Sequence, residues 1–159
     1  MITATTKSAD DTRELGAGLA SLAVPSDVVL VAGELGSGKT TFAQGFGRGL
    51  GVTEPIVSPT FTLVRSYQGR LPLVHCDVYR LDHLHEVADL DLPELLDEGG
   101  VALVEWGDVV ASALPAAFLA VRLEFGTGDD DRRLQLRPVG PSWSSRMGPL
   151  RAVLDRWQA

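Results

Sequence analysis

The sequence lacks the features that mark secreted, disulfide-stabilised and membrane proteins. Cys76 is the single cysteine among 159 residues, so no disulfide can form within the chain. No apolar run approaches the roughly 18 residues that a membrane-spanning helix needs. The first residues, MITATTKSADD, have neither the basic start nor the apolar core of a signal peptide. We therefore expect a cytoplasmic protein that does not contact a membrane.

Positive charge is also scarce. Lys and Arg together number 14 against 21 Asp and Glu, which gives a formal net charge of −7. Direct binding to a nucleic-acid backbone depends on clustered basic side chains that displace counterions, so any role with nucleic acid is expected to be indirect. The composition, 45% hydrophobic and 22% charged, is otherwise that of an ordinary globular protein. The length fits a single domain over residues 1–159.

The first third of the chain predicts a helix, a buried strand and a second helix. Ser8 to Asp11 has the form of a capping box and begins an amphipathic helix that ends before Pro25. Residues 28–32 are apolar on both faces, as in a central parallel strand. Apolar residues at every fourth position predict a helix over residues 39–50, with Gly51 as its terminator. Three glycines inside that helix leave two alternatives open, namely close packing against a neighbour or a helix end that moves.

Period-two patterns in the rest of the chain predict two hairpins. Residues 61–67 and 71–78 flank one turn, and residues 119–125 and 134–136 flank an acidic loop. Between the hairpins we expect short helices over residues 83–88 and 93–98 and a buried strand, VALVE, over residues 101–105. An apolar stripe predicts a C-terminal helix from Trp143 to Trp157.

The stretch GELGSGKTT, residues 33–41, matches the phosphate-binding pattern GxxxxGK[ST]. It lies between a predicted strand and a predicted helix, which is the context that this motif requires. The glycines let backbone N–H groups turn toward phosphates, the ammonium of Lys39 reaches the terminal phosphates, and the hydroxyl of Thr40 is placed to bind Mg²⁺. The predicted nucleotide-binding residues are Gly33, Glu34, Leu35, Gly36, Ser37, Gly38, Lys39, Thr40 and Thr41. The fold class is therefore α/β, a three-layer P-loop NTPase domain with a mixed parallel and antiparallel sheet.

Two acidic residues follow predicted strands and are candidates for metal binding and water activation. Asp77 ends LVHCD and Glu105 ends VALVE. Because its strand is the more uniformly apolar, we assign Glu105 to the metal, directly or through a water, together with Thr40. Asp77 is expected to orient the attacking water or to sense the terminal phosphate, and the predicted catalytic residues are thus Asp77, Glu105 and Lys39. The alternative for both carboxylates is an ordinary surface position at a strand end.

Weaker candidates surround this set. Thr60 lies where nucleotide switches place a residue that senses the γ-phosphate, although an ordinary turn is the alternative. Arg80 is a candidate for contact with phosphate or with a partner protein. The alternative is that it forms an ordinary exposed ion pair. Trp106 packs either beside the site or into the core. His75 and Cys76 point to opposite faces of one strand, so a zinc site is not expected.

Four segments occur in order between Gly33 and Trp106: GELGSGKTTFAQGFGRGLG, SPTFTLVRSY, HCDVYRL and LVEW. Together they closely resemble the TsaE (YjeE) family, small bacterial P-loop ATPases required for the threonylcarbamoyladenosine modification of tRNA. The resemblance implies an ATPase that uses ATP and Mg²⁺ and drives or resets the transferase proteins TsaD and TsaB, reaching tRNA only through that complex.

The resemblance also implies roles for single residues. Lys39 contacts phosphate, Thr40 and Glu105 hold magnesium, and Asp77 acts in hydrolysis. The start of the first helix, at Ser8 and Ala9, is expected near the adenine.

A phosphate-binding loop also occurs in proteins with other functions. A small-metabolite kinase needs an acceptor pocket and an arginine-bearing lid that closes over the phosphates. No such lid is evident in the sequence, because Arg132, Arg133 and Arg137 lie in or beside a predicted strand. The lack of an Asn-Lys-x-Asp motif disfavours a GTPase. A non-catalytic module whose binding depends on nucleotide stays open. No residue is an evident arginine finger, so we expect slow intrinsic hydrolysis that a partner stimulates.

Overall fold

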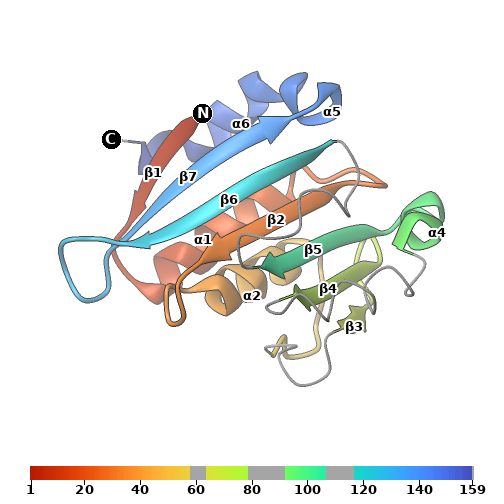
Figure 1. The fold of residues 1–159 in the computed structure, drawn as a ribbon, viewed down its shortest axis with the longest axis horizontal. Coiled ribbons are helices and arrows are strands. Elements are labelled where there is room, and N and C mark those ends of the chain that lie inside the picture. Colours follow the sequence, from red (N-terminus) through yellow and green to blue (C-terminus); the bar gives the residue numbers. More distant parts are fainter. Residues whose placement is uncertain (58–63, 79–91, 107–116, 159) are drawn as a thin grey trace.

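The computed structural model describes residues 1–57, 64–78, 92–106 and 117–158. Within these ranges the strands form a seven-stranded sheet in the order β1-β7-β6-β2-β5-β4-β3 (Figure 1). The strands are β1 (Ile2–Thr6), β2 (Val28–Gly33), β3 (Val64–Tyr67), β4 (Leu73–Val78), β5 (Val101–Trp106), β6 (Phe118–Phe125) and β7 (Arg132–Val139). The helices are α1 (Ala9–Ala20), α2 (Lys39–Gly49), α4 (Leu92–Asp97), α5 (Pro141–Ser144), α6 (Met147–Leu154) and the 3₁₀-helix η2 (Asp155–Trp157). None of these helices is long and apolar enough to cross a membrane.

The sheet is mixed, as the sequence predicts. Its central strand, β2, pairs in parallel with β5 and β6, and β5 also pairs in parallel with β4. The antiparallel pairs β3–β4 and β6–β7 are the two predicted hairpins, which are confirmed over the residues described. The edge strand β1, antiparallel to β7, was not predicted. Its apolar Ile2 and Ala4 are buried and alternate with threonines, a pattern too short to stand out.

Helices cover both faces of the sheet, which confirms the three-layer arrangement. On one face, Val29 and Val31 of β2 belong to the larger apolar core, to which α1, α2, α5 and α6 contribute. On the other face, Val28 and Leu30 share a smaller core with Leu96 of α4. Because successive residues of a strand point to opposite faces, a strand between two cores must be apolar throughout. This accounts for the uninterrupted apolar run that precedes the phosphate-binding motif.

Glycines bring α1 and α2 into backbone contact. A Cβ atom on Gly45 would lie 2.0 Å from the carbonyl oxygen of Arg13, and one on Gly49 would lie 2.5 Å from that of Ala17. Any side chain at these positions would push the helices apart. Of the two explanations that the sequence left open for the glycines of the second helix, the structure supports close packing. The orientation of α2 is therefore fixed by its contact with α1.

The ends of the first helices follow the predicted signals. The Oγ of Ser8 accepts a hydrogen bond from the N–H of Asp11 at 3.0 Å, as an N-cap should. Asp11 in turn accepts from the N–H of Lys7 at 2.9 Å. Gly51 has a φ of +84°, the left-handed conformation expected just beyond a helix. Helix α4 matches the predicted helix over residues 93–98 to within one residue, whereas residues 83–88 lie outside the described part of the chain.

The prediction of one C-terminal helix from Trp143 to Trp157 is wrong. The chain forms α5, α6 and η2 in succession. Pro149 has no N–H to donate to the carbonyl of Ser145, and its ring would clash with that carbonyl if the helix were continuous. A new helix therefore begins at Met147 and places Pro149 in its first turn, where proline is tolerated.

Candidate functional site

The phosphate-binding motif forms the loop between β2 and α2, at the carboxyl end of the central parallel strand. Gly36 and Gly38 have φ values of +81° and +106°, which side-chain-bearing residues rarely adopt. A Cβ atom on Gly33 would lie 2.4 Å from the Oγ of Ser37 and 2.8 Å from the carbonyl oxygen of Leu123. Glycine is thus required at three positions of the loop, each for a reason visible in the structure. Open α/β sheets bind ligands at the carboxyl ends of their parallel strands, where this loop lies.

Lys39 and Thr40 lie in the first turn of α2, directly after the glycines. The Nζ of Lys39 donates a hydrogen bond to the carbonyl oxygen of Gly33 at 2.7 Å, so the side chain folds back along its own loop. Lys39, Thr40 and Thr41 are all half-buried, whereas Leu35 at the tip of the loop is 96% exposed. A lysine, a hydroxyl group and a helix N-terminus therefore converge at one loop, which is the arrangement that binds phosphate groups.

Asp77 and Glu105 are direct neighbours on the parallel strands β4 and β5. Paired residues share a face of the sheet, and Glu105 is also paired with Val31 of β2, two residues before the phosphate-binding loop. Asp77 is 9% exposed and Glu105 is 2% exposed. Both carboxylates therefore lie at the carboxyl ends of their strands, the same end of the sheet as the loop, and on the face that α2 covers. Their burial disfavours the alternative of ordinary surface carboxylates.

A hydrogen bond that the sequence did not predict joins Glu105 to His75. The Nε2 of His75 contacts the Oε2 of Glu105, and both side chains are buried. His75 and Asp77 are two residues apart on β4 and therefore point to the same face. The sequence offered one signal for this contact, namely the two-residue spacing that places His75 and Asp77 on one face of their strand. That signal could be used only once β4 and β5 were known to be parallel neighbours.

Cys76 points to the opposite face, into the smaller core. Burial first, and the nearby charge of Asp77 second, raise the pKa of its thiol to about 12. The thiol therefore stays protonated at neutral pH. Among the described residues no group of three or more His, Cys, Asp and Glu side chains is arranged to hold a metal ion.

Arg132, which the sequence reasoning did not connect with the site, contacts the phosphate-binding loop. Its Nε donates to the carbonyl oxygen of Ser37 at 2.9 Å, and its Nη2 donates to that of Gly36 at 3.4 Å. These residues are 95 and 96 positions apart in the sequence. Only the arrangement of the strands brings them together, so no local pattern could have revealed the contact.

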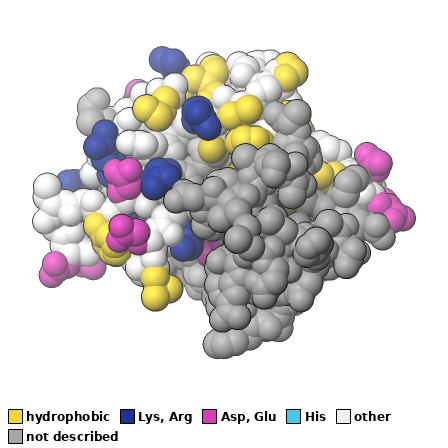
Figure 2. All heavy atoms as spheres, viewed as in Figure 1, with side chains coloured by type: hydrophobic (Ala, Val, Ile, Leu, Met, Phe, Trp, Pro, Cys, Tyr) yellow, Lys and Arg dark blue, Asp and Glu magenta, His cyan; other side chains and the backbone are white. Residues whose placement is uncertain are grey.

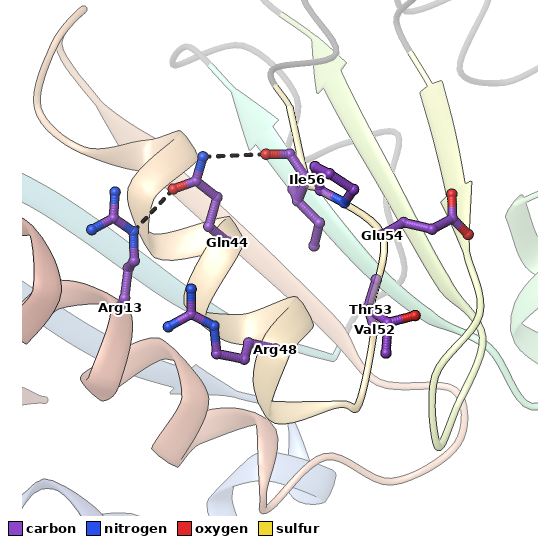
Figure 3. A pocket seen from close by; sticks show the side chains of 8 residues that line it. Arg13, Gln44, Arg48, Val52, Thr53, Glu54 and Ile56 are labelled. Atoms are coloured by element: carbon purple, nitrogen blue, oxygen red, sulfur yellow. Dashed lines mark hydrogen bonds between the residues drawn. The ribbon is translucent and has the colours of Figure 1, made fainter.

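A polar pocket of about 380 Å³ opens beside α1 and α2 (Figure 3). Arg13 donates to Oε1 of Gln44 at 3.1 Å, and Nε2 of Gln44 donates to the carbonyl oxygen of Ile56 at 3.2 Å. Gln44 lies one turn after Thr40 on the same helix. The pocket thus adjoins the nucleotide helix, but its lining does not include the phosphate-binding loop.

Of the weaker candidates, Ser8, Ala9 and Trp106 lie within the described residues. Ser8 uses its side chain to cap α1. Trp106 ends β5, paired with Ala32 of β2, and its side chain lies outside what the structure describes. Thr60 and Arg80 lie outside the described residues.

The mixed sheet, with its glycine loop and buried strand-end carboxylates, defines a P-loop NTPase fold. The family model for "Threonylcarbamoyl adenosine biosynthesis protein TsaE" matches residues 6–134. The chain belongs to the TsaE family.

Individual relatives agree with this assignment. The chain is 42% identical over 132 residues to the tRNA threonylcarbamoyladenosine biosynthesis protein TsaE of Bacillus subtilis, an alignment that covers 82% of each chain. It is 41% identical over 140 residues to the TsaE protein of Streptomyces coelicolor, covering 84% of this chain and 94% of that one. The crystal structure of Bacillus subtilis YdiB is similar, with a TM-score of 0.78, 35% identity and coverage of 98% of this chain and 97% of the other.

Proposed function

We propose that this protein is the ATP-binding and ATP-hydrolysing component of the tRNA threonylcarbamoyladenosine modification machinery. It uses ATP to drive or reset a partner transferase complex. The observation that carries the proposal is the convergence of the glycine loop with two buried carboxylates on neighbouring strands. Family membership supplies the biological context.

The loop residues 33–41 would bind the phosphates of ATP. Lys39 would exchange the carbonyl oxygen of Gly33 for a phosphate oxygen, which is a short movement for a flexible side chain. Backbone N–H groups of the loop and of the first turn of α2 would supply the remaining donors.

The chain offers oxygen donors that suit Mg²⁺. Magnesium in nucleotide sites takes one or two protein oxygens and completes its shell with phosphate oxygens and water. Thr40 supplies a hydroxyl group, and Glu105 supplies a carboxylate whose other oxygen is held by His75. Bound there, the ion would neutralise the charge that builds up on the phosphates. Asp77 on β4, which pairs with Glu105 on β5, would orient the attacking water.

The proposed partners are the transferase proteins TsaD and TsaB, with tRNA reached only through them. The net charge of −7 disfavours direct binding to a tRNA backbone. On the face shown in Figure 2, the Lys and Arg side chains of the described residues lie among Asp and Glu and do not form one broad basic patch.

The variant Glu105→Gln tests the proposal because it keeps the shape and an acceptor for His75 while removing the charge. We expect it to retain most ATP binding and to lose activity that depends on the transferase pair. Glu94→Gln, an exposed position on α4, is the matched control and should behave like the wild type. Full partner-dependent activity in Glu105→Gln would show instead that nucleotide acts only as a binding switch.

A further inference from the structure

Arg132 ties together two loops at one edge of the sheet. It is the first residue of β7, where it pairs with Phe125 of β6 and Thr6 of β1, so its backbone is held by strands on both sides. Figure 1 shows the β6–β7 loop and the β2–α2 loop at the same end of the sheet. The guanidinium lies 4.9 Å from the ring centroid of Phe125, which restricts its position further.

The guanidinium makes hydrogen bonds to carbonyl groups of both loops. It donates to Ser37 and Gly36 in the phosphate-binding loop, and its Nη1 donates to the carbonyl oxygens of Asp129 and Asp131 at 2.9 and 2.8 Å. These bonds are charge-assisted, which makes them stronger than bonds between neutral groups. A planar guanidinium can hold several carbonyls at fixed angles, whereas a lysine ammonium cannot.

The contact with Ser37 lies on the carbonyl side of its peptide group, opposite the N–H that would face a phosphate. In a trans peptide the C=O and N–H groups point in opposite directions, so the carbonyl of Ser37 and the N–H of Gly38 face opposite ways. A positive charge at that carbonyl polarises the peptide and strengthens its N–H as a donor. The backbone N–H groups of such loops are the groups that cradle nucleotide phosphates. Arg132 would thus strengthen the N–H donors of the loop through their carbonyl groups, without itself contacting phosphate.

We propose that Arg132 is a positioning residue of the nucleotide site, which fixes and polarises the phosphate-binding loop before the nucleotide arrives. The inference rests on the proposed nucleotide-binding function and assigns part of the affinity to a residue outside the motif. Pre-ordering a loop increases affinity because less conformational freedom is lost on binding. The effect is on the loop as a whole, so it applies to ADP and to ATP alike.

The test is equilibrium binding of ATP and ADP to the wild type, Arg132→Met, Arg132→Lys and the control Arg133→Met. Arg133 is the next residue on β7, is exposed and carries the same charge. For Arg132→Met we expect both affinities to fall about tenfold, the loss of roughly one charge-assisted hydrogen bond. Arg132→Lys should recover part of that loss and Arg133→Met should lose none. Thermal unfolding without nucleotide shows whether Arg132→Met is folded.

The outcomes separate this inference from the proposed function. If the wild type binds neither nucleotide, the proposed function fails and the role of Arg132 fails with it. If the wild type binds both and Arg132→Met matches it or matches Arg133→Met, the inference alone is overturned. A loss confined to ATP would also overturn it, because that result would mean direct contact with the γ-phosphate.

Discussion

His75 and Glu105 share a hydrogen bond between neighbouring parallel strands, and both side chains are buried. A buried carboxylate needs a partner, because its desolvation is otherwise uncompensated. His75 therefore holds the carboxylate of Glu105 in a defined orientation, and we expect the pair to act as a unit in stability as well as in position.

Replacing His75 by Leu should lower the free energy of unfolding by about 3 kcal/mol, because Glu105 is left buried without this partner. His75→Gln keeps a donor near the position of Nε2 and should lose much less. Urea denaturation of both variants measures the difference. The double variant His75→Leu/Glu105→Met removes both polar groups. Its loss of unfolding free energy should be smaller than the sum of the losses in His75→Leu alone and Glu105→Met alone. Losses that simply add would mean that the two side chains do not interact.

Lys39→Ala should lower the affinity for ATP by about 100-fold, because the ammonium supplies charge-assisted hydrogen bonds to phosphate. Isothermal titration calorimetry with ATP provides the measurement. Lys7→Ala is the control, since the side chain of Lys7 is 71% exposed and lies outside the motif. Equal affinities of the two variants for ATP would remove Lys39 from the phosphate site.

Gly45→Ala should lower the free energy of unfolding by about 3 kcal/mol, near the upper end for overpacked cores, since its Cβ would meet the backbone of Arg13. Gly148→Ala offers a contrast, because the added Cβ would meet no atom within 4 Å from other described parts of the chain, and the residue is in α6. That substitution should stabilise the protein by about 0.5–1 kcal/mol. Chemical denaturation distinguishes the two, and a neutral Gly45→Ala would show that α1 and α2 do not pack so closely.

The buried thiol of Cys76 predicts a loss of stability at alkaline pH. Its pKa is raised to about 12 in the folded protein, by burial and by Asp77, whereas an unfolded thiol has a pKa near 8.5. Below the unfolded pKa both states are protonated and the thiol has no effect. Above it the unfolded state loses its proton first, which favours unfolding by about 2 kcal/mol at pH 10.

Comparison with Cys76→Ala isolates this contribution from other groups that titrate in the same range. The difference in unfolding free energy between wild type and variant should be constant up to about pH 8 and should then shift against the wild type. A difference that stays constant to pH 10 would mean that the thiol ionises equally well in the folded protein.

Local chemistry made the centre of the molecule predictable. The uninterrupted apolar run of β2, the glycines that follow it and the start of α2 at Lys39 each depend on neighbours in the sequence, and the structure agrees with all three. Asp77 and Glu105 were predictable as strand-end carboxylates for the same reason. Their direct pairing needed the order of the strands.

The relationships that sequence reasoning missed are those between distant segments. Arg132 reaches Ser37 only because β6 lies between β7 and β2, and His75 meets Glu105 only because β4 lies beside β5. The prediction of one C-terminal helix was wrong for a reason that is visible in the sequence itself, since Pro149 interrupts the apolar stripe on which the prediction was based. An apolar period records burial, and it does not by itself establish one continuous helix.

Steady-state phosphate release tests the central claim most directly. ATP and GTP are supplied in turn to the protein alone and to the protein with the purified transferase pair and its tRNA substrate. The account predicts slow release from ATP by the protein alone, clear preference over GTP, and an increase when the pair and tRNA are added. Release that does not change on adding them, or none from ATP under any condition, would contradict it.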